Sequence, residues 1–330
     1  MEVISSKYKF FFRLILVLKI ILISIILILF LIKNSTIKTD IDKEKFNNNF
    51  DYSKYGRNLI TKKMKNQAGW LLTPTQARFI NGIISYHKPK RCLEVGVADG
   101  GSAVLILNSL RIINNDSILI SLDLYENLYN NITKKTGYRV KKYFPELMKN
   151  WKLFTGDQPH KFLEKLNMKF DFVFLDTSHH SPGELINILE ILPFLNEKAI
   201  VVLHDINIHL YKNIKSLNYR PTQIYLMSCL FGEKVYVKNK HHIIDNIGAV
   251  FLHENQQKHY LDYFLLLTTL WEYMLSDAQI NDLRIFIKKY YKEKIYLDLF
   301  NRSVRRSKQF LNKYNKFLNK NNITTKFFLK

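Results

Sequence analysis

The feature that most constrains this chain is a short apolar run that breaks into a glycine turn and then resumes as an apolar helix. The run Cys92–Val95 is typical of a buried strand and carries one acidic residue, Glu94. Gly96, Gly100 and Gly101 follow it directly. Glycines let a backbone approach a ligand closely, and a helix N-terminus offers free N–H groups. This strand–turn–helix unit predicts an α/β sheet with a nucleotide-type ligand at its first turn.

The spacing of the turn, Glu94-x-Gly96-x-x-x-Gly100-x-Ser102, differs from the dinucleotide-binding fingerprint. That fingerprint has a middle glycine that admits a pyrophosphate, and this chain has Ala98 in its place. The difference argues against an NAD-dependent dehydrogenase. An aminopropyl transferase on the same fold would need a pair of acidic residues that bind an amine, and the sequence shows no such signature. A similar crossover that binds no cofactor, in a non-catalytic scaffold, stays open as the other alternative.

The acid-first turn resembles the first motif of the class I S-adenosylmethionine-dependent methyltransferases. The resemblance extends over roughly residues 70–255 and is closest to the divalent-cation-dependent O-methyltransferases, such as the catechol and caffeoyl-CoA enzymes. It implies a Rossmann-like seven-stranded methyltransferase sheet and transfer of a methyl group from S-adenosylmethionine to an oxygen of the acceptor. It also implies that Glu94, Gly96, Gly100 and Ser102 bind this cofactor.

Acidic residues stand where further buried strands are expected to end, and ligands of open α/β sheets lie at the carboxyl ends of the strands. Asp123 follows the second strand, where an acid can accept both hydroxyls of a ribose, and the resemblance assigns it that role. Asp157 follows the third strand, at the place where the resembling enzymes meet the adenine. The strands are predicted at Ser117–Leu122, Lys152–Phe154, Phe170–Asp176 and Ala199–Asp205, with an antiparallel pair at Lys234–Val237 and Ile247–His253.

The chemical centre is predicted at Asp176 and at the pair His204-Asp205, which end two neighbouring strands. Carboxylate oxygens a strand apart can hold a hard cation such as Mg²⁺, and the resemblance places metal ligands at these positions. The usual residues at the second position are Asp-Asn or an acidic pair, so His204 departs from the pattern. His179 follows Asp176 by three residues, and the resemblance makes it the general base that deprotonates the acceptor hydroxyl.

The segment from Leu14 to Ile32 is apolar apart from Ser24 and one charge, Lys19. Its 19 residues are close to the ~20 that a helix needs to cross a bilayer. No small-residue site for cleavage by a signal peptidase follows it. We therefore expect an uncleaved, single-pass membrane anchor. Because S-adenosylmethionine is a cytoplasmic metabolite, the resemblance implies a catalytic domain on the cytoplasmic side.

The remaining composition bounds the organisation of the chain and its partners. Lys and Arg (50) exceed Asp and Glu (28), which gives a formal charge of +22. The excess has two equally good explanations: a functional basic surface, or the Lys-rich composition that an AT-biased genome produces. No nucleic-acid partner is expected. The expected acceptor is a small molecule, a sugar or a glycolipid. The predicted parts are a basic tail (1–13), the anchor (14–32), a linker (33–66), the methyltransferase domain (67–255) and a basic helical extension (256–330).

Within the extension, helices are predicted over 260–275, 278–291 and 297–317. In the catalytic domain, a helix is predicted to begin at Thr73 and Pro74, with Thr73 as its cap. Another is predicted over Pro182–Leu195. Strands alternating with helices in this way favour a parallel sheet covered on both faces.

Overall fold

The structure is a computed structural model that describes residues 50–57, 59–67, 72–113, 116–210, 221–238 and 244–320. The chain divides into two compact units, with the division between Phe50 and Asp51. The predicted basic tail (1–13), the anchor (14–32) and the linker up to residue 49 lie outside the described residues. Within the described part, no helix combines the length and the apolar character that crossing a membrane requires.

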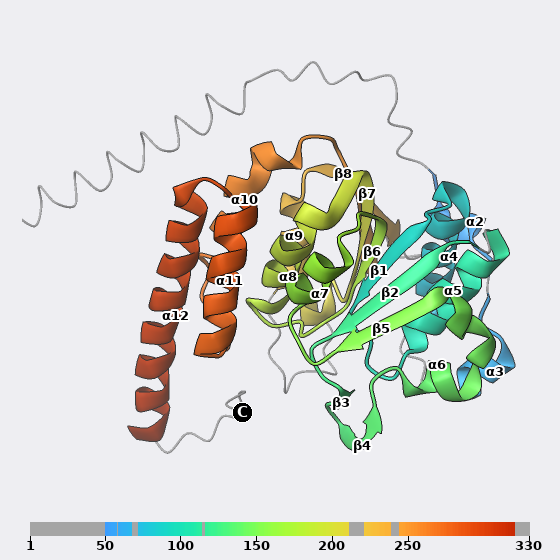
Figure 1. The fold of residues 1–330 in the computed structure, drawn as a ribbon, viewed down its shortest axis with the longest axis horizontal. Helices are drawn as coiled ribbons and strands as arrows, with labels where there is room; N and C mark the ends of the chain where they lie inside the picture. The colour runs from blue at the N-terminus through green and yellow to red at the C-terminus, as the bar shows by residue number, and fades with distance from the viewer. Residues whose placement is uncertain are drawn as a thin grey trace, which may run out of the picture. The chain divides into compact units, whose positions relative to one another are not determined.

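A seven-stranded mixed sheet forms the centre of the second unit, in the order β5-β2-β1-β6-β7-β9-β8 (Figure 1). β5, β2, β1, β6 and β7 run parallel, β9 runs antiparallel to β7, and β8 runs antiparallel to β9. The sheet therefore confirms the predicted strands and the closing antiparallel pair. The strands are β1 Arg91–Val95, β2 Ile118–Asp123, β5 Trp151–Thr155, β6 Phe170–Leu175, β7 Leu195–His204, β8 Gly232–Lys238 and β9 Ile244–Leu252.

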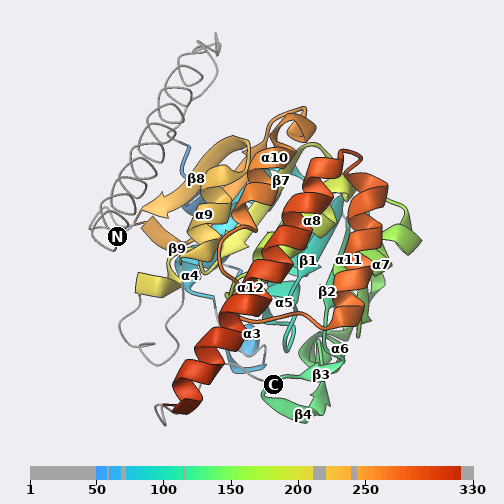
Figure 2. The same cartoon turned by 90° about the vertical axis from the view of Figure 1, so that its left-hand side faces the viewer.

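Helices cover both faces of the sheet (Figures 1 and 2). α2 to α6 belong to the core on one face, and α7 to α12 belong to the core on the other. The helices are α2 Tyr52–Tyr55, α3 Lys62–Gln67, α4 Pro74–His87, α5 Gly101–Ile113, α6 Tyr138–Tyr143, α7 Pro159–Leu166, α8 Gly183–Ile191, α9 Thr222–Cys229, α10 Tyr260–Leu266, α11 Asp277–Tyr290 and α12 Lys294–Lys320.

The central strands contribute side chains to both cores, which explains their continuous apolar sequences. In β1, Cys92 belongs to the core with α4 and α5, whereas Leu93 belongs to the core with α8 and α11. Phe172 and Val173 of β6 alternate in the same way. A strand buried on both faces has no need of polar alternation.

Helix α4 begins as its sequence predicts. The hydroxyl of Thr73 accepts a hydrogen bond from the backbone N–H of Gln76 at 3.2 Å, and the side chain of Gln76 accepts one from the N–H of Thr73 at 2.9 Å. This reciprocal capping satisfies two N–H groups that the helix cannot pair internally. It also fixes Gln76, which reaches the site described below.

Two boundaries differ from the sequence-based expectation. The second half of the predicted linker contains α2 and all of α3 except its last residue, and Tyr52 and Met64 of these helices are buried in the core with α4 and α5. No separate body begins after residue 255, because Tyr263 and Phe264 of α10 are buried in the core of the sheet. The helical extension is therefore an integral layer of this unit.

The helix predicted over 260–275 ends as α10 at Leu266. Trp271 is completely buried beyond it, and its indole N–H donates to the carbonyl of Leu267 at 3.0 Å. Burial of this ring redirects the chain, so a tertiary contact prevails over the helical pattern. The small hairpin of β3 (Asn127–Leu128) and β4 (Asn131–Lys135) was not predicted, because its polar, exposed residues carry no apolar alternation.

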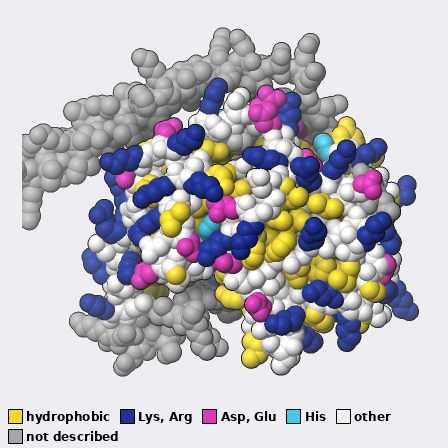
Figure 3. All heavy atoms as spheres, in the orientation of Figure 1, with side chains coloured by type: hydrophobic (Ala, Val, Ile, Leu, Met, Phe, Trp, Pro, Cys, Tyr) yellow, Lys and Arg dark blue, Asp and Glu magenta, His cyan; other side chains and the backbone are white. Residues whose placement is uncertain are grey.

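The Lys and Arg side chains do not gather in a single patch on the face shown in Figure 3. They are spread over it among apolar and uncharged side chains. The formal charge of +22 therefore does not translate into one concentrated basic surface on this face.

Candidate active site

The glycine turn after β1 allows the ends of two strands to meet. Gly96 has φ 89°, and a Cβ atom built there would lie 1.8 Å from the backbone oxygen of Asp176, at the end of β6. Gly100 has φ 100°, and a Cβ atom there would lie 2.8 Å from the side chain of Val140. Only glycine satisfies both the positive φ and the close contact at these positions.

Glu94 is completely buried and joins three elements of the turn. Its two carboxylate oxygens accept hydrogen bonds from the hydroxyls of Ser102 in α5 and Ser121 in β2, each at 2.6 Å. Burial raises the pKa of Glu94 to about 7, although both serines act in the opposite direction. The carboxylate therefore holds β1, β2 and the start of α5 together, and its predicted contact with the cofactor stays a prediction.

Asp123 ends β2 beside the same turn. Its Oδ2 accepts hydrogen bonds from the backbone N–H groups of Val97 at 2.9 Å and Ala98 at 3.1 Å, and its Oδ1 accepts one from Tyr125 at 2.9 Å. The carboxylate thus positions the loop where the ribose is predicted to bind. Asp123 also pairs with Thr155 of β5, which brings the end of β5 alongside it.

Asp157, the predicted adenine contact, lies just beyond the end of β5. Its carboxylate accepts the N–H of Gln158 at 2.9 Å and lies 3.1 Å from Nζ of Lys161. Lys161 also lies 2.6 Å from the carboxylate of Asp282 in α11. The structure therefore places Asp157 near Asp123, and it also gives Asp157 a structural partner of its own.

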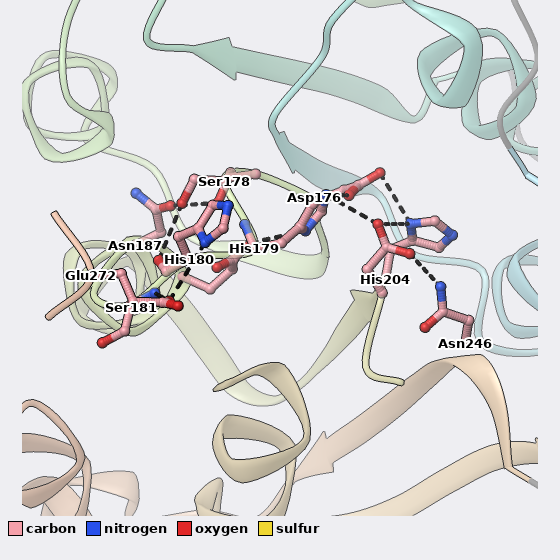
Figure 4. A network of polar contacts seen from close by, with 12 residues as sticks. Asp176, Ser178, His179, His180, Ser181, Asn187, His204, Asn246 and Glu272 are labelled. Carbon is pink, nitrogen blue, oxygen red and sulfur yellow. Dashed lines mark hydrogen bonds and ion pairs between the residues drawn. The ribbon is translucent and has the colours of Figure 1, made fainter. Parts of the chain in front are cut away.

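The predicted chemical centre assembles at the ends of β6 and β7 (Figure 4). Asp176, His179 and Asp205 each direct one donor atom to a common place, and these atoms lie within 4.8 Å of one another. Nε2 of His179 lies 3.0 Å from Oδ2 of Asp205 and 3.6 Å from Oδ1 of Asp176. Such a group of carboxylates and imidazole can hold a metal ion.

His204, the last residue of β7, adjoins this group. Its Nδ1 lies 3.3 Å from Oδ2 of Asp176 and 3.4 Å from Oδ2 of Asp205, and its Nε2 lies 3.4 Å from Oε1 of Gln76. The predicted ligand set was Asp176, His204 and Asp205, with His179 apart from it as a base. In the structure, both imidazoles face the two carboxylates.

Opposite charges within the cluster govern the protonation of its members. Burial by itself lowers the pKa of His204, but the carboxylates of Asp176 and Asp205 raise it to about 10. Burial also lowers the pKa of His179, whereas Glu184, Asp176 and Asp205 together raise it to about 9. As the side chains stand, both imidazoles hold a proton at neutral pH and offset the charge of the acids.

Two residues that the sequence did not indicate orient the members of the cluster. Oε1 of Glu184, near the start of α8, accepts the backbone N–H of His179 at 2.8 Å and lies 3.3 Å from its Nδ1. The side-chain amide of Asn246 in β9 donates a hydrogen bond to Oδ1 of Asp205. Glu184 is an acid in a first helical turn, where acids are common because the helix dipole stabilises them, so its sequence context suggests no catalytic role.

The loop that carries His179 is attached to the segment between α10 and α11. The N–H of Ser181 donates to Oε2 of Glu272, and the N–H of Glu272 donates to the carbonyl of Ser181, both at 2.7 Å. Nδ1 of His180 lies 3.6 Å from Oε2 of Glu272 (Figure 4). The hydroxyl of Tyr273 hydrogen-bonds with Ser178. No pattern in the sequence connects residue 181 with residue 272.

A second buried network supports the other side of this loop. Nδ1 of His160 in α7 lies 2.6 Å from Oε1 of Glu190, and the amide of Asn187 donates to Oε2 of Glu190 at 3.0 Å. The hydroxyl of Thr177 then donates to Oδ1 of Asn187 at 3.0 Å. The residue after Asp176 is thus tied to α7 and α8.

Solved methyltransferase structures are among those to which this chain is similar. Among solved structures, the chain is similar to the Streptomyces achromogenes O-methyltransferase TomG, which is involved in tomaymycin synthesis and was solved with SAM (12% identity, 59% of this chain and 91% of that chain, TM-score 0.43). It is also similar to the SAH-bound methyltransferase PaMTH1 of Podospora anserina (17%, 59% and 89%, 0.45) and to an SAH-bound Bacillus cereus O-methyltransferase (16%, 58% and 93%, 0.42). No curated protein matches the chain significantly.

The family model described as a methyltransferase domain matches residues 93–206. These residues run from β1 to the turn that follows β7. They include the glycine turn, Asp123 and the whole cluster of Asp176, His179 and Asp205. This chain therefore carries a methyltransferase domain.

Proposed function

We propose that this chain is an S-adenosylmethionine-dependent methyltransferase that methylates a hydroxyl group of a small molecule, a sugar or a glycolipid. The observation that carries the proposal is the arrangement of two subsites at one edge of the parallel sheet. The glycine turn and Asp123 lie at the ends of β1 and β2, and the Asp–His–Asp cluster lies at the ends of β6 and β7. Because β1 pairs with both β2 and β6, the two subsites adjoin.

The first subsite suits the nucleoside part of S-adenosylmethionine, whose ribose carries two hydroxyl groups. Backbone N–H groups at the start of α5 face the turn, and the carboxylate of Asp123 is only half-buried beside it. Asp123 already orders the amides of Val97 and Ala98, and its oxygens have lone pairs left for the hydroxyls of a ribose. The loop is thus preorganised for the ligand.

The second subsite suits a divalent cation together with the acceptor. Carboxylate oxygens of Asp176 and Asp205 and a nitrogen of His179 lie within 4.8 Å of one another, so the donor set fits such an ion. A bound dication lowers the pKa of a hydroxyl that it contacts. The chain itself orients this subsite, since Glu184 fixes His179 and Asn246 fixes Asp205. Holding the acceptor in line with the methyl group supplies much of the acceleration.

The predicted role of His179 as general base stays a prediction. Its two ring nitrogens face Glu184 on one side and Asp205 and Asp176 on the other. The raised pKa of about 9 keeps a proton on the ring at neutral pH, so this imidazole is a poor base as it stands. A dication held by the two aspartates would oppose the field that raises this pKa.

We also propose that residues 14–32 anchor the enzyme in a membrane, with the catalytic domain on the cytoplasmic side. The support is the apolar sequence from Leu14 to Ile32, since these residues lie outside the described part of the structure. A membrane-bound enzyme would meet a lipid-linked acceptor readily. Alkaline extraction of membranes tests the anchor, because release of the chain by this wash would exclude an integral span.

Titration calorimetry of the full-length chain with S-adenosylmethionine tests the proposed function. We expect saturable binding of S-adenosylmethionine and its demethylated product, and no binding of NAD⁺. Binding of NAD⁺ instead would favour another enzyme on the same fold. Binding of neither nucleotide would favour a non-catalytic scaffold.

A further inference from the structure

We propose that the cation centre at the ends of β6 and β7 is a mixed nitrogen–oxygen site that takes a transition-metal dication, such as Mn²⁺ or Co²⁺, in preference to Mg²⁺. In this site, Nε2 of His179 is a ligand together with the carboxylates of Asp176 and Asp205. The inference deepens the proposed function and rests on it, because it assigns the chemical class of the cation at the same site. It also replaces the role of general base that the sequence suggested for His179.

The distances between the donor atoms fit ligands around one ion. Metal–ligand bonds of about 2.0–2.2 Å place two neighbouring ligands of the same ion roughly 3–3.5 Å apart. Nε2 of His179 lies 3.0 Å from Oδ2 of Asp205 and 3.6 Å from Oδ1 of Asp176. These side chains come from two neighbouring parallel strands and the loop after β6, so the backbone of the sheet brings them together.

His204 provides an independent indication that a ligand belongs here. Its side chain is 93% buried, and its Nδ1 faces the two aspartates at 3.3 and 3.4 Å without meeting hydrogen-bond geometry among the described residues. Its direction toward the cluster places a second nitrogen beside the ion.

The surroundings of His179 are those of a metal-bound histidine. Such a histidine usually turns its second ring nitrogen toward a carboxylate, which fixes the orientation of the ring. Here Nδ1 of His179 lies 3.3 Å from the buried carboxylate of Glu184, which also accepts the backbone N–H of His179 at 2.8 Å. The opposite nitrogen, Nε2, is thereby directed at Asp176 and Asp205.

This donor set determines which ions fit. Mg²⁺ requires oxygen ligands in near-octahedral geometry and retains several waters. Imidazole nitrogen favours later first-row ions, and affinity generally rises from Mn²⁺ to Co²⁺ at a given nitrogen–oxygen site. One nitrogen among the ligands and a second beside them therefore shift the preference of this centre away from Mg²⁺.

Binding of Mn²⁺ to the chelator-treated, full-length chain tests the proposal without an acceptor substrate. We expect Mn²⁺ to bind more tightly than Mg²⁺ in calorimetric titrations, because only Mn²⁺ should gain from the imidazole ligand. Pulsed electron paramagnetic resonance of the Mn²⁺-bound chain should show the coupling of a directly bound imidazole nitrogen. Equal affinities for Mn²⁺ and Mg²⁺ without this coupling, or binding of neither ion, would overturn the proposal.

The variant His179→Asn tests whether the imidazole nitrogen that couples to Mn²⁺ belongs to His179. Asparagine tolerates the φ of 55° at this position, so the loop keeps its conformation, and circular dichroism checks the fold. We expect the coupling to disappear and Mn²⁺ affinity to fall by at least the ~10–100-fold typical of a lost supporting residue. His253→Asn, which changes a histidine outside the cluster, is the matched control. Coupling that persists in His179→Asn and vanishes in His204→Asn would transfer the ligand role to His204 and refute the assignment.

Calorimetry with S-adenosylmethionine on the same samples separates this proposal from the proposed function. Retained binding of S-adenosylmethionine without a nitrogen-ligated ion overturns only the metal assignment. Failure of the unmodified chain to bind S-adenosylmethionine overturns the proposed function.

Discussion

The two halves of the site stabilise their charged groups in different ways. At the ends of β1 and β2, the acids are held by neutral groups: serine hydroxyls bind Glu94, and backbone amides bind Asp123. At the ends of β6 and β7, Asp176 and Asp205 instead face two imidazoles. The first half is complete with groups close to the turn, whereas the second balances charge against charge and needs distant segments to hold it. The first is therefore suited to a neutral, hydroxyl-bearing ligand part, and the second to an ion.

If the halves are independent in this sense, Asp176→Ala should show the largest effect and confine it to the second half. Loss of one of the two carboxylates should weaken Mn²⁺ binding by more than ~100-fold, beyond the usual effect of a supporting residue. Binding of S-adenosylmethionine should change little, since no hydrogen bond links the Asp176 side chain to the glycine turn among the described residues. Parallel calorimetry with both ligands checks this, and equal losses for both would show that the halves are one unit.

Among the residues that the structure describes, the side chain of Glu94 hydrogen-bonds with serine hydroxyls and with no cationic group, which should appear in the pH dependence of stability. Burial raises the pKa of Glu94 from 4.5 to about 7, so the folded state retains a proton that the unfolded chain loses. Its contribution is therefore fully present below pH 4.5 and is lost as the pH rises toward 7. The loss amounts to roughly 3 kcal/mol at most. Urea denaturation at pH 5 and pH 8 gives the free energy of unfolding at each pH. Between these two pH values, Glu94→Gln should lose less of this free energy than the parent chain, and equal losses would contradict the shifted pKa.

Asp123→Ala tests the other side of the comparison. Loss of hydrogen bonds to a charged acceptor costs about 1.5–3 kcal/mol, or roughly ten- to a hundredfold in affinity for S-adenosylmethionine. Mn²⁺ affinity should stay within experimental error. Asp123→Asn keeps a side-chain oxygen that can accept the N–H groups of Val97 and Ala98, but it removes the negative charge. Comparison of the two variants therefore separates the effect of a disordered loop from the effect of the lost charge. Undiminished affinity in Asp123→Ala would remove the ribose assignment.

The smallest expected effect concerns the distant support of the second half. Glu272→Ala removes a contact to Ser181 and His180, so the loop with His179 should be less well oriented, and Mn²⁺ affinity should fall by ~10-fold. Glu254→Ala is the matched control, because its carboxylate pairs with Lys198 on the surface. Equal Mn²⁺ affinities in the two variants would show that the segment after α10 does not position the ion site.

The sequence predicts the first half better than the second for a physical reason. Glu94, Ser102 and Gly96 lie within one strand–turn–helix unit, so their spacing encodes their contacts. The parallel strands also placed Asp176 and Asp205 correctly at one edge. The orientation of His179 could not be read from spacing, because it depends on a positive φ of 55° and on Glu184.

The contacts of Glu272 and Asn246 with the site depend on how separate segments of the chain pack. No local pattern marks either residue, since each is one polar side chain among many. The predicted boundary at residue 255 failed for the same reason: the change to long helical patterns is visible in the sequence, but the burial of Phe264 and Trp271 against the sheet is not. Non-local packing is the information that pattern and propensity lack.

The attachment of Trp271 has a thermodynamic consequence for the outermost helix. Its backbone N–H donates to Ser307 of α12 at 3.2 Å, its ring lies 6.2 Å from that of Phe300 in the same helix, and the next residue, Glu272, pairs with Ser181. Two consecutive residues, Trp271 and Glu272, thus connect α12 with the loop of His179. If a displacement of α12 moved Trp271 and Glu272, a partner that binds α12 would change ion affinity, and the ion would change the binding of that partner by the same free energy.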